Sequence, residues 1–149
     1  MRLSTTIPLF TRQLTANGRW RHTQAAYERD LRAMGRWFTL SIHAEGLGED
    51  AEISAITPDH LARFLISDMV HCTPDGRPRA AISVNRTKSA LRSFFQFCVE
   101  SGFLEENPAR LIRSSPATPR SRRAWRLTRS RPSVPFWQGR VAHWQTGTG

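Results

Sequence analysis

The sequence contains no long apolar run. None of its 149 residues belongs to an uninterrupted apolar stretch near the roughly 18 residues that a membrane-spanning helix needs. Residues 1–6 also lack the apolar core of a secretory signal. We therefore expect a soluble, cytoplasmic protein that does not associate with a membrane.

Cysteine is scarce as well. Cys72 and Cys98 are the only two, and neither stands in a CxxC or Cys/His spacing typical of zinc ligands. Phe97 and Val99 flank Cys98, which predicts a small core residue rather than a reactive thiol. The sequence also lacks a phosphate-binding loop, a dinucleotide fingerprint and a nucleophile elbow. We expect no metal, no cofactor and no small-molecule substrate.

Acidic residues are missing from the last quarter of the chain. Residues 113–149 contain eight Arg and no Asp or Glu, whereas residues 1–112 contain 14 Lys and Arg against 12 Asp and Glu. The net charge of +10 suggests a polyanionic partner, but most of this charge lies in the tail. The tail is rich in Arg, Ser and Pro and has no periodic apolar face, which predicts disorder.

The rest of the chain is a series of amphipathic segments without the alternation typical of strands. Residues 5–17 carry apolar side chains at helical spacing and end at a glycine that favours a helix stop. Residues 23–40 repeat apolar side chains along one face, with charged residues such as Asp30 on the other sides. Two helices are predicted here.

Further helix starts follow. Thr57 before Pro58 predicts the capped start of a third helix, whose apolar stripe continues to Met69. Ser83 is predicted to cap a long fourth helix, and residues 107–112 are predicted to form one more short helix. The expected fold is an all-α bundle of four to five helices.

The order of these features carries more information than any one of them. The series comprises Thr23-Gln24-Ala25-Ala26-Tyr27-Glu28-Arg29-Asp30-Leu31-Arg32, Trp37-Phe38, Ile56-Thr57, His60-Leu61, Phe64-Leu65, Ser83-Val84-Asn85-Arg86, Ser89-Ala90-Leu91-Arg92-Ser93-Phe94-Phe95, Gly102-Phe103-Leu104 and Asn107-Pro108-Ala109. In this register it closely resembles the N-terminal core-binding domain of tyrosine recombinases, the phage integrase and Xer-like group. The resemblance covers residues 4–112. It implies a SAM-like bundle that forms half of a clamp around double-stranded DNA, opposite a C-terminal catalytic domain.

The fourth predicted helix offers candidate DNA contacts. Arg86, Ser89 and Ser93 recur at i, i+3 and i+7, with Lys88 and Arg92 beside them. No acidic residue interrupts this stretch, so the helix can contact phosphates from its polar face. The alternative is a basic face that is only solvated.

The start of the second predicted helix offers another candidate contact. Arg21, Thr23 and Gln24 lie where free backbone N–H groups and the helix dipole favour a phosphate. The alternative is that Thr23 only caps the helix and the arginine is solvated.

Two residues could suggest catalysis. The resemblance implies a tyrosine nucleophile, but the one tyrosine, Tyr27, falls on an apolar helix stripe and is predicted to pack in the core. His60 and Arg63 match the spacing of the family's His-x-x-Arg catalytic box, yet no tyrosine follows them. We interpret this match as a coincidence on a helix surface.

The sequence thus predicts a DNA-binding N-terminal domain of a site-specific recombinase or integrase, over residues 4–112. Residues 113–149 are expected to be a tail without the catalytic domain, so this chain is not expected to act as an enzyme by itself. The alternative is a protein-interaction module that binds or inhibits a full-length recombinase.

Overall fold

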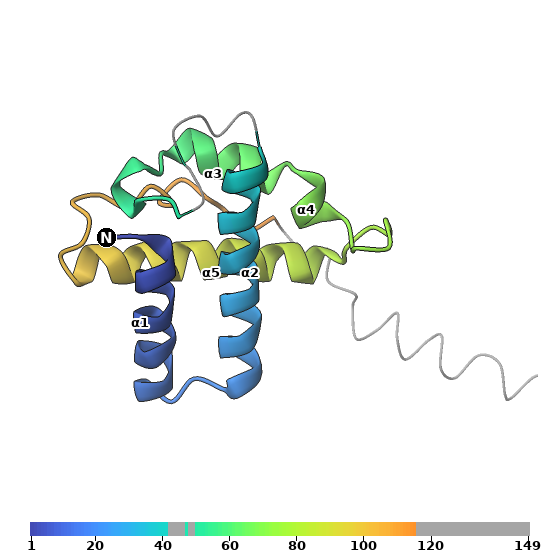
Figure 1. The fold of residues 1–149 in the computed structure, drawn as a ribbon. Helices are drawn as coiled ribbons and strands as arrows, with labels where there is room; N and C mark the ends of the chain where they lie inside the picture. Colours follow the sequence, from blue (N-terminus) through green and yellow to red (C-terminus); the bar gives the residue numbers. More distant parts are fainter. Residues whose placement is uncertain (42–46, 48–49, 116–149) are drawn as a thin grey trace, which may run out of the picture. The chain divides into compact units, whose positions relative to one another are not determined.

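The computed structural model describes residues 1–41, 47 and 50–115. Its elements in chain order are α1 (Leu3–Ala16), α2 (Arg21–Leu40), the 3₁₀-helix η1 (Ile53–Ala55), α3 (Pro58–Leu65), α4 (Asp68–His71) and α5 (Ala81–Glu100) (Figure 1). The described residues form no strand and only isolated β-bridges. The predicted all-α fold is confirmed. The predicted disorder of the tail concerns residues that, apart from 113–115, lie outside the described part.

Two long helices and one crossing helix build the framework. α1 and α2 lie side by side and antiparallel, and α5 crosses both of them (Figure 1). α4 contacts α3 and α5. Within the described part, no helix is both long and apolar enough to cross a membrane.

Asp50 and Ala51, which precede η1, form hydrogen bonds to the first turn of α1. The backbone N–H of Ser4 donates to Asp50 Oδ1 at 2.9 Å, so a carboxylate from a distant segment satisfies a free donor at the helix N-terminus. The hydrogen bonds from the Ser4 hydroxyl and N–H lower the pKa of Asp50. Leu3 N–H also donates to the carbonyl of Ala51 at 3.0 Å. These contacts fix the chain entry onto α1.

Glycines end the helices α1 and α5 as the sequence predicts. Gly18 and Gly102 have φ angles of 71° and 79°, in the left-handed region that favours glycine. The backbone hydrogen bonds that follow are those of a Schellman motif at both ends. The Phe103 ring folds back onto α5, where its centroid lies 6.2 Å from that of Phe97.

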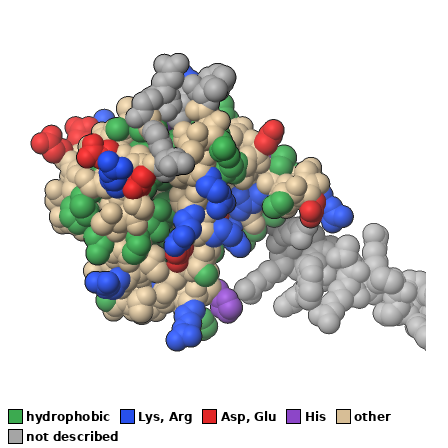
Figure 2. All heavy atoms as spheres, in the orientation of Figure 1, with side chains coloured by type: hydrophobic (Ala, Val, Ile, Leu, Met, Phe, Trp, Pro, Cys, Tyr) green, Lys and Arg blue, Asp and Glu red, His purple; other side chains and the backbone are tan. Residues whose placement is uncertain are grey.

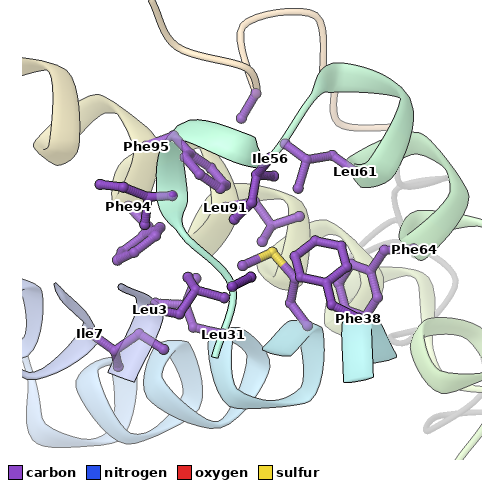
Figure 3. Close-up of a cluster of buried hydrophobic side chains, with 14 of the residues drawn as sticks. Leu3, Ile7, Leu31, Phe38, Ile56, Leu61, Phe64, Leu91, Phe94 and Phe95 are labelled. Atoms are coloured by element: carbon purple, nitrogen blue, oxygen red, sulfur yellow. The ribbon is translucent and has the colours of Figure 1, made fainter. Parts of the chain in front are cut away.

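The core lies where α1, α2, α3 and α5 meet (Figure 3). Its members are apolar side chains with little or no exposure, among them Leu3, Ile7, Phe10, Leu31, Met34, Phe38, Ile56, Leu61, Phe64, Leu91, Phe94, Phe95 and Cys98. Burial raises the pKa of Cys98 to about 12, so its thiol stays protonated at neutral pH. Tyr27 is partly buried against this cluster.

The third helix is shorter than the sequence predicts. α3 ends at Leu65, and a separate turn, α4, starts after Ser67. The Ser67 hydroxyl donates to the Phe64 carbonyl at 2.6 Å and so competes with the helical hydrogen bonds at the break. Met69 is only partly buried as a result, whereas Val70 is fully buried.

Two predicted helix starts were wrong. α5 begins at Ala81, with Ala80 as its N-cap, so Ser83 lies inside the first turn instead of capping it. The reason is tertiary, because the Arg79 N–H donates to the His71 carbonyl at 2.7 Å and fixes where the preceding loop ends. Residues 107–112 form turns rather than a helix, and Asn107 Oδ1 accepts the Ala109 N–H at 2.8 Å.

Candidate nucleic-acid interface

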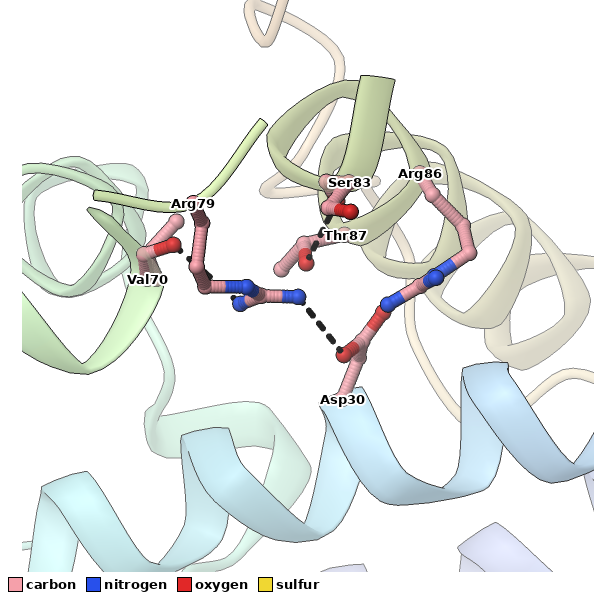
Figure 4. A network of polar contacts seen from close by, with 6 residues as sticks. All are labelled: Asp30, Val70, Arg79, Ser83, Arg86 and Thr87. Carbon is pink, nitrogen blue, oxygen red and sulfur yellow. Dashed lines mark hydrogen bonds and ion pairs between the residues drawn. The ribbon is translucent and has the colours of Figure 1, made fainter. Parts of the chain in front are cut away.

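A buried carboxylate organises the basic residues between α2 and α5. Asp30 of α2 is only 4% exposed and lies between two arginines (Figure 4). Its Oδ2 accepts a hydrogen bond from Arg86 Nε at 3.2 Å, and its Oδ1 lies 3.8 Å from Arg79 Nη2. Arg79 Nη1 also donates to the Val70 carbonyl at 3.1 Å. One carboxylate therefore joins α2, α5 and the loop that follows α4.

The sequence placed Asp30 among the charged residues on the outer sides of the second helix, and this prediction was wrong. Asp30 precedes Met34 by four residues, so it borders the apolar stripe of α2. That spacing was a usable signal for partial burial. Its partners could not be read in the same way, since Arg79 and Arg86 are 49 and 56 positions further along the chain.

A groove of about 1090 Å³ opens beside this ion cluster. α2, α4, the loop after α4 and the start of α5 form its walls. Figure 2 shows Lys and Arg side chains gathered over α2 and toward α4. Four arginines line it, namely Arg29, Arg36, Arg79 and Arg86, together with the acids Asp30 and Asp68. The groove thus combines two arginines held by Asp30 with two on the surface of α2.

Arg29 and Arg36 belong to a longer row on α2. Arg21, Arg29 and Arg36 are all exposed, and their spacing of eight and seven residues places them on one side of the helix. At the usual rise of an α-helix, the row extends about 22 Å along the axis. Of these three arginines, only Arg21 was predicted from the sequence to contact DNA. The signal that could have found Arg29 and Arg36 is their spacing of seven residues, which places them on the same side of the helix.

The structure separates the residues predicted on the fourth helix into two groups. Arg86 faces Asp30 and the groove. Lys88 and Arg92 lie on the opposite flank of α5, where they donate to residues 112–115. Ser89 is partly buried and accepts a hydrogen bond from Arg92 Nη2 at 3.3 Å. Ser93 is exposed and follows Arg86 by seven residues, which places it on the same side of α5 as Arg86.

The residues predicted at the start of the second helix also divide. α2 begins at Arg21 with Trp20 as its N-cap, so Thr23 lies in the first turn and does not cap the helix. Gln24 stabilises the turn between α1 and α2, because its Nε2 donates to the Arg19 carbonyl at 2.6 Å and its Oε1 accepts from the Thr15 hydroxyl at 3.1 Å. Arg21 alone remains an exposed cation of this group.

His60 takes part in a helix cap. Its backbone N–H donates to Thr57 Oγ1 at 3.3 Å, and its Nδ1 accepts the Thr57 N–H at 3.2 Å, so the two residues form a capping box at the start of α3. Arg63 pairs with Asp59 at 2.8 Å on the same exposed turn. The described residues include no group of His, Cys, Asp and Glu side chains that could hold a metal ion.

The cap gives a first testable prediction. Thr57→Ala removes the side-chain acceptor for the His60 N–H and is expected to lower the free energy of unfolding by about 1 kcal/mol. Thr5→Ala, an exposed change on α1, serves as the control and is expected to shift it by less than about 0.5 kcal/mol. Urea denaturation followed by circular dichroism measures both. Equal stability of the two variants would show that the cap contributes nothing.

The comparisons with known proteins give one match. A family model described as "Phage integrase, N-terminal SAM-like domain" matches residues 7–102 of the chain. No curated protein and no solved structure matches. The matched range includes α2 to α5 and most of α1, and therefore the Asp30 cluster and the arginines of the groove.

Proposed function

Because the chain belongs to the phage integrase N-terminal SAM-like domain family, we propose that it is a recombinase-associated domain that binds double-stranded DNA. The observation that carries this proposal is the groove between α2 and α5, with its four arginines. We name this groove and the α2 row of Arg21, Arg29 and Arg36 together the basic surface.

The geometry of the basic surface suits a duplex backbone. A row about 22 Å long covers more than half of the roughly 34 Å helical turn of B-DNA, so its members can meet several phosphates in succession. Arginine forms charge-assisted hydrogen bonds to phosphate oxygens, often through two parallel N–H groups. Such contacts position a protein on DNA without reading its sequence.

The four arginines of the groove are not equivalent. Asp30 offsets part of the charge of Arg79 and Arg86 and holds their guanidinium groups in place. Arg29 and Arg36 are exposed on α2, so they supply most of the attraction for a phosphate. We expect Arg29 and Arg36 to dominate the salt dependence of binding, and Arg79 and Arg86 to set its geometry.

The decisive test is a double variant of the full chain, Arg29→Ala with Arg36→Ala. The slope of log affinity against log salt is negative, and each lost phosphate contact makes it shallower by about 0.9. The double variant is therefore expected to show a slope that is shallower by about 2 and to bind every duplex more weakly. Fluorescence anisotropy with a labelled duplex over a range of salt concentrations measures both quantities.

The matched control is Arg63→Ala with Arg110→Ala. These two arginines are exposed, pair with carboxylates four residues earlier and do not line the groove. The control removes two positive charges, as the groove variant does, so both variants have the same net charge. The arginines of the tail are present in both variants and contribute equally. If the control loses as much slope as the groove variant, binding follows net charge and the basic surface is not the site.

We further propose that this domain holds DNA without performing strand transfer. Tyr27 packs against the core, and His60 is engaged in the capping box of α3. Neither residue lines the groove. The expected dissociation constants of this domain for generic duplexes are those of non-specific binding, about 10⁻⁴ to 10⁻⁶ M. A groove variant that binds DNA as well as the unaltered chain would favour the protein-interaction alternative.

A further inference from the structure

Residues 113–115 run along the exposed side of α5 and are held there by side chains of the helix. Asn85 makes a pair of hydrogen bonds to the backbone of Ser115, donating from Nδ2 to its carbonyl at 2.9 Å and accepting its N–H on Oδ1 at 3.0 Å. Lys88 Nζ donates to the Ser115 hydroxyl at 3.0 Å, and Arg92 Nη2 donates to the Ser114 hydroxyl at 3.0 Å. We name residues 113–115 the strap.

The three binding residues form a row that fits an extended chain. Asn85, Lys88 and Arg92 stand at i, i+3 and i+7, so they follow one another along a single side of α5. Asn85 recognises the backbone itself, in the way that a neighbouring strand would, and the two cations take up the serine hydroxyls. Arg92 Nη1 adds a long contact to the Ile112 carbonyl at 3.5 Å.

The strap is bound by two side chains, Lys88 and Arg92, that the sequence predicts as DNA contacts. Lys88 and Arg92 are basic residues of α5, but each donates a hydrogen bond to an uncharged serine hydroxyl. A phosphate oxygen carries negative charge and a serine hydroxyl does not, so a phosphate close to α5 attracts the ammonium and guanidinium groups more strongly and would displace a hydroxyl. A DNA backbone that reaches this flank of α5 would therefore compete with the strap for Lys88 and Arg92.

We propose that the strap is an autoinhibitory contact, which occupies Lys88 and Arg92 in the free protein and leaves α5 when duplex DNA binds. This inference rests on the proposed function, since it requires DNA to reach the molecule through the basic surface. Its consequence is that DNA gains a second line of contacts on α5 only after residues 113–115 have left the helix.

Two amide signals and one lysine allow a direct test on the full chain. The Ser115 N–H donates to Asn85, whereas the Leu104 N–H donates to the Cys98 carbonyl at 3.2 Å within the helix cap and serves as the internal reference. Lys88 is the only lysine in the sequence, so lysine acetylation read by mass spectrometry reports on this position alone. Saturating duplex DNA is expected to raise amide exchange at Ser115 roughly tenfold, to leave Leu104 unchanged and to protect Lys88 from acetylation.

The matching variant is Asn85→Ala, which removes the backbone contacts and keeps both cations. It is expected to raise Ser115 exchange without DNA and to tighten DNA binding roughly threefold to tenfold, because the competing contact is lost. Gln96→Ala is the control, since Gln96 is exposed on α5 and bonds to Glu100 and Asn107 instead of the strap. It is expected to change neither quantity.

The outcomes separate this inference from the proposed function. If DNA binds but Ser115 exchange stays the same or slows, the strap remains on α5 and the competition is refuted. The same holds if Asn85→Ala leaves DNA affinity unchanged or weakens it. If no variant binds DNA at all, the proposed function fails, and the competition fails with it.

Discussion

Phe94→Ala is expected to lower the free energy of unfolding by about 3–5 kcal/mol, the range for deleting a buried aromatic side chain. The Phe94 side chain is fully buried on α5. Its ring meets that of Phe10 on α1 edge-on, with centroids 5.5 Å apart, and that of Phe95 at 5.1 Å. Alanine would leave a cavity at the crossing of α1 and α5. For a domain whose total stability is about 5–15 kcal/mol, this loss is large enough to populate the unfolded chain.

The measurement for Phe94→Ala is urea denaturation monitored by circular dichroism. Ile82→Ala on the same helix is the control, because Ile82 is 75% exposed and its truncation is expected to cost less than about 0.5 kcal/mol. A loss below about 1 kcal/mol for Phe94→Ala would mean that α1 and α5 repack around the missing ring or are not joined through it.

Asp30→Ala is expected to have the second largest effect on stability, a loss of about 2 kcal/mol. Removing one partner of a fully buried ion pair costs about 3–5 kcal/mol, because the remaining charge is left without a partner. Here the penalty is smaller, since the side chains of Arg79 and Arg86 are 17% and 31% exposed and their guanidinium groups can turn to water. The same variant makes the groove more positive, because Arg79 and Arg86 lose the carboxylate that offsets their charge. The slope of log DNA affinity against log salt is therefore expected to become steeper.

The control for Asp30→Ala is Glu106→Ala. Glu106 also faces an arginine, Arg110, but its carboxylate is 78% exposed and lies 4.0 Å away, so this change is expected to cost less than about 0.5 kcal/mol. Asp30→Asn complements the pair, since it keeps the side-chain shape and an acceptor but removes the charge. If Asp30→Ala is as stable as the unaltered chain, the ion cluster does not join the helices.

Much of the fold could be predicted because its signals are local. The apolar stripes of α1, α2 and α5, the cap of α3 at Thr57 and the stops at Gly18 and Gly102 depend on residues within one or two turns of each other. The all-α class and the family follow from the order of these signals. The prediction was wrong where a distant contact decides a boundary, as at Ala81, which follows a loop fixed by the Arg79–His71 hydrogen bond.

The candidate site was less predictable, because its contacts join residues from different helices that lie far apart in the sequence. The sequence by itself determined which helix faces are apolar, where the helices start and stop within a few residues, and that α5 carries cations without an acid between them. Only the tertiary structure decided that Asp30 is buried between Arg79 and Arg86 and that Lys88 and Arg92 face the strap. Spacing along a helix fixes the side on which a residue lies, but the crossing of α2 and α5 fixes what that side meets.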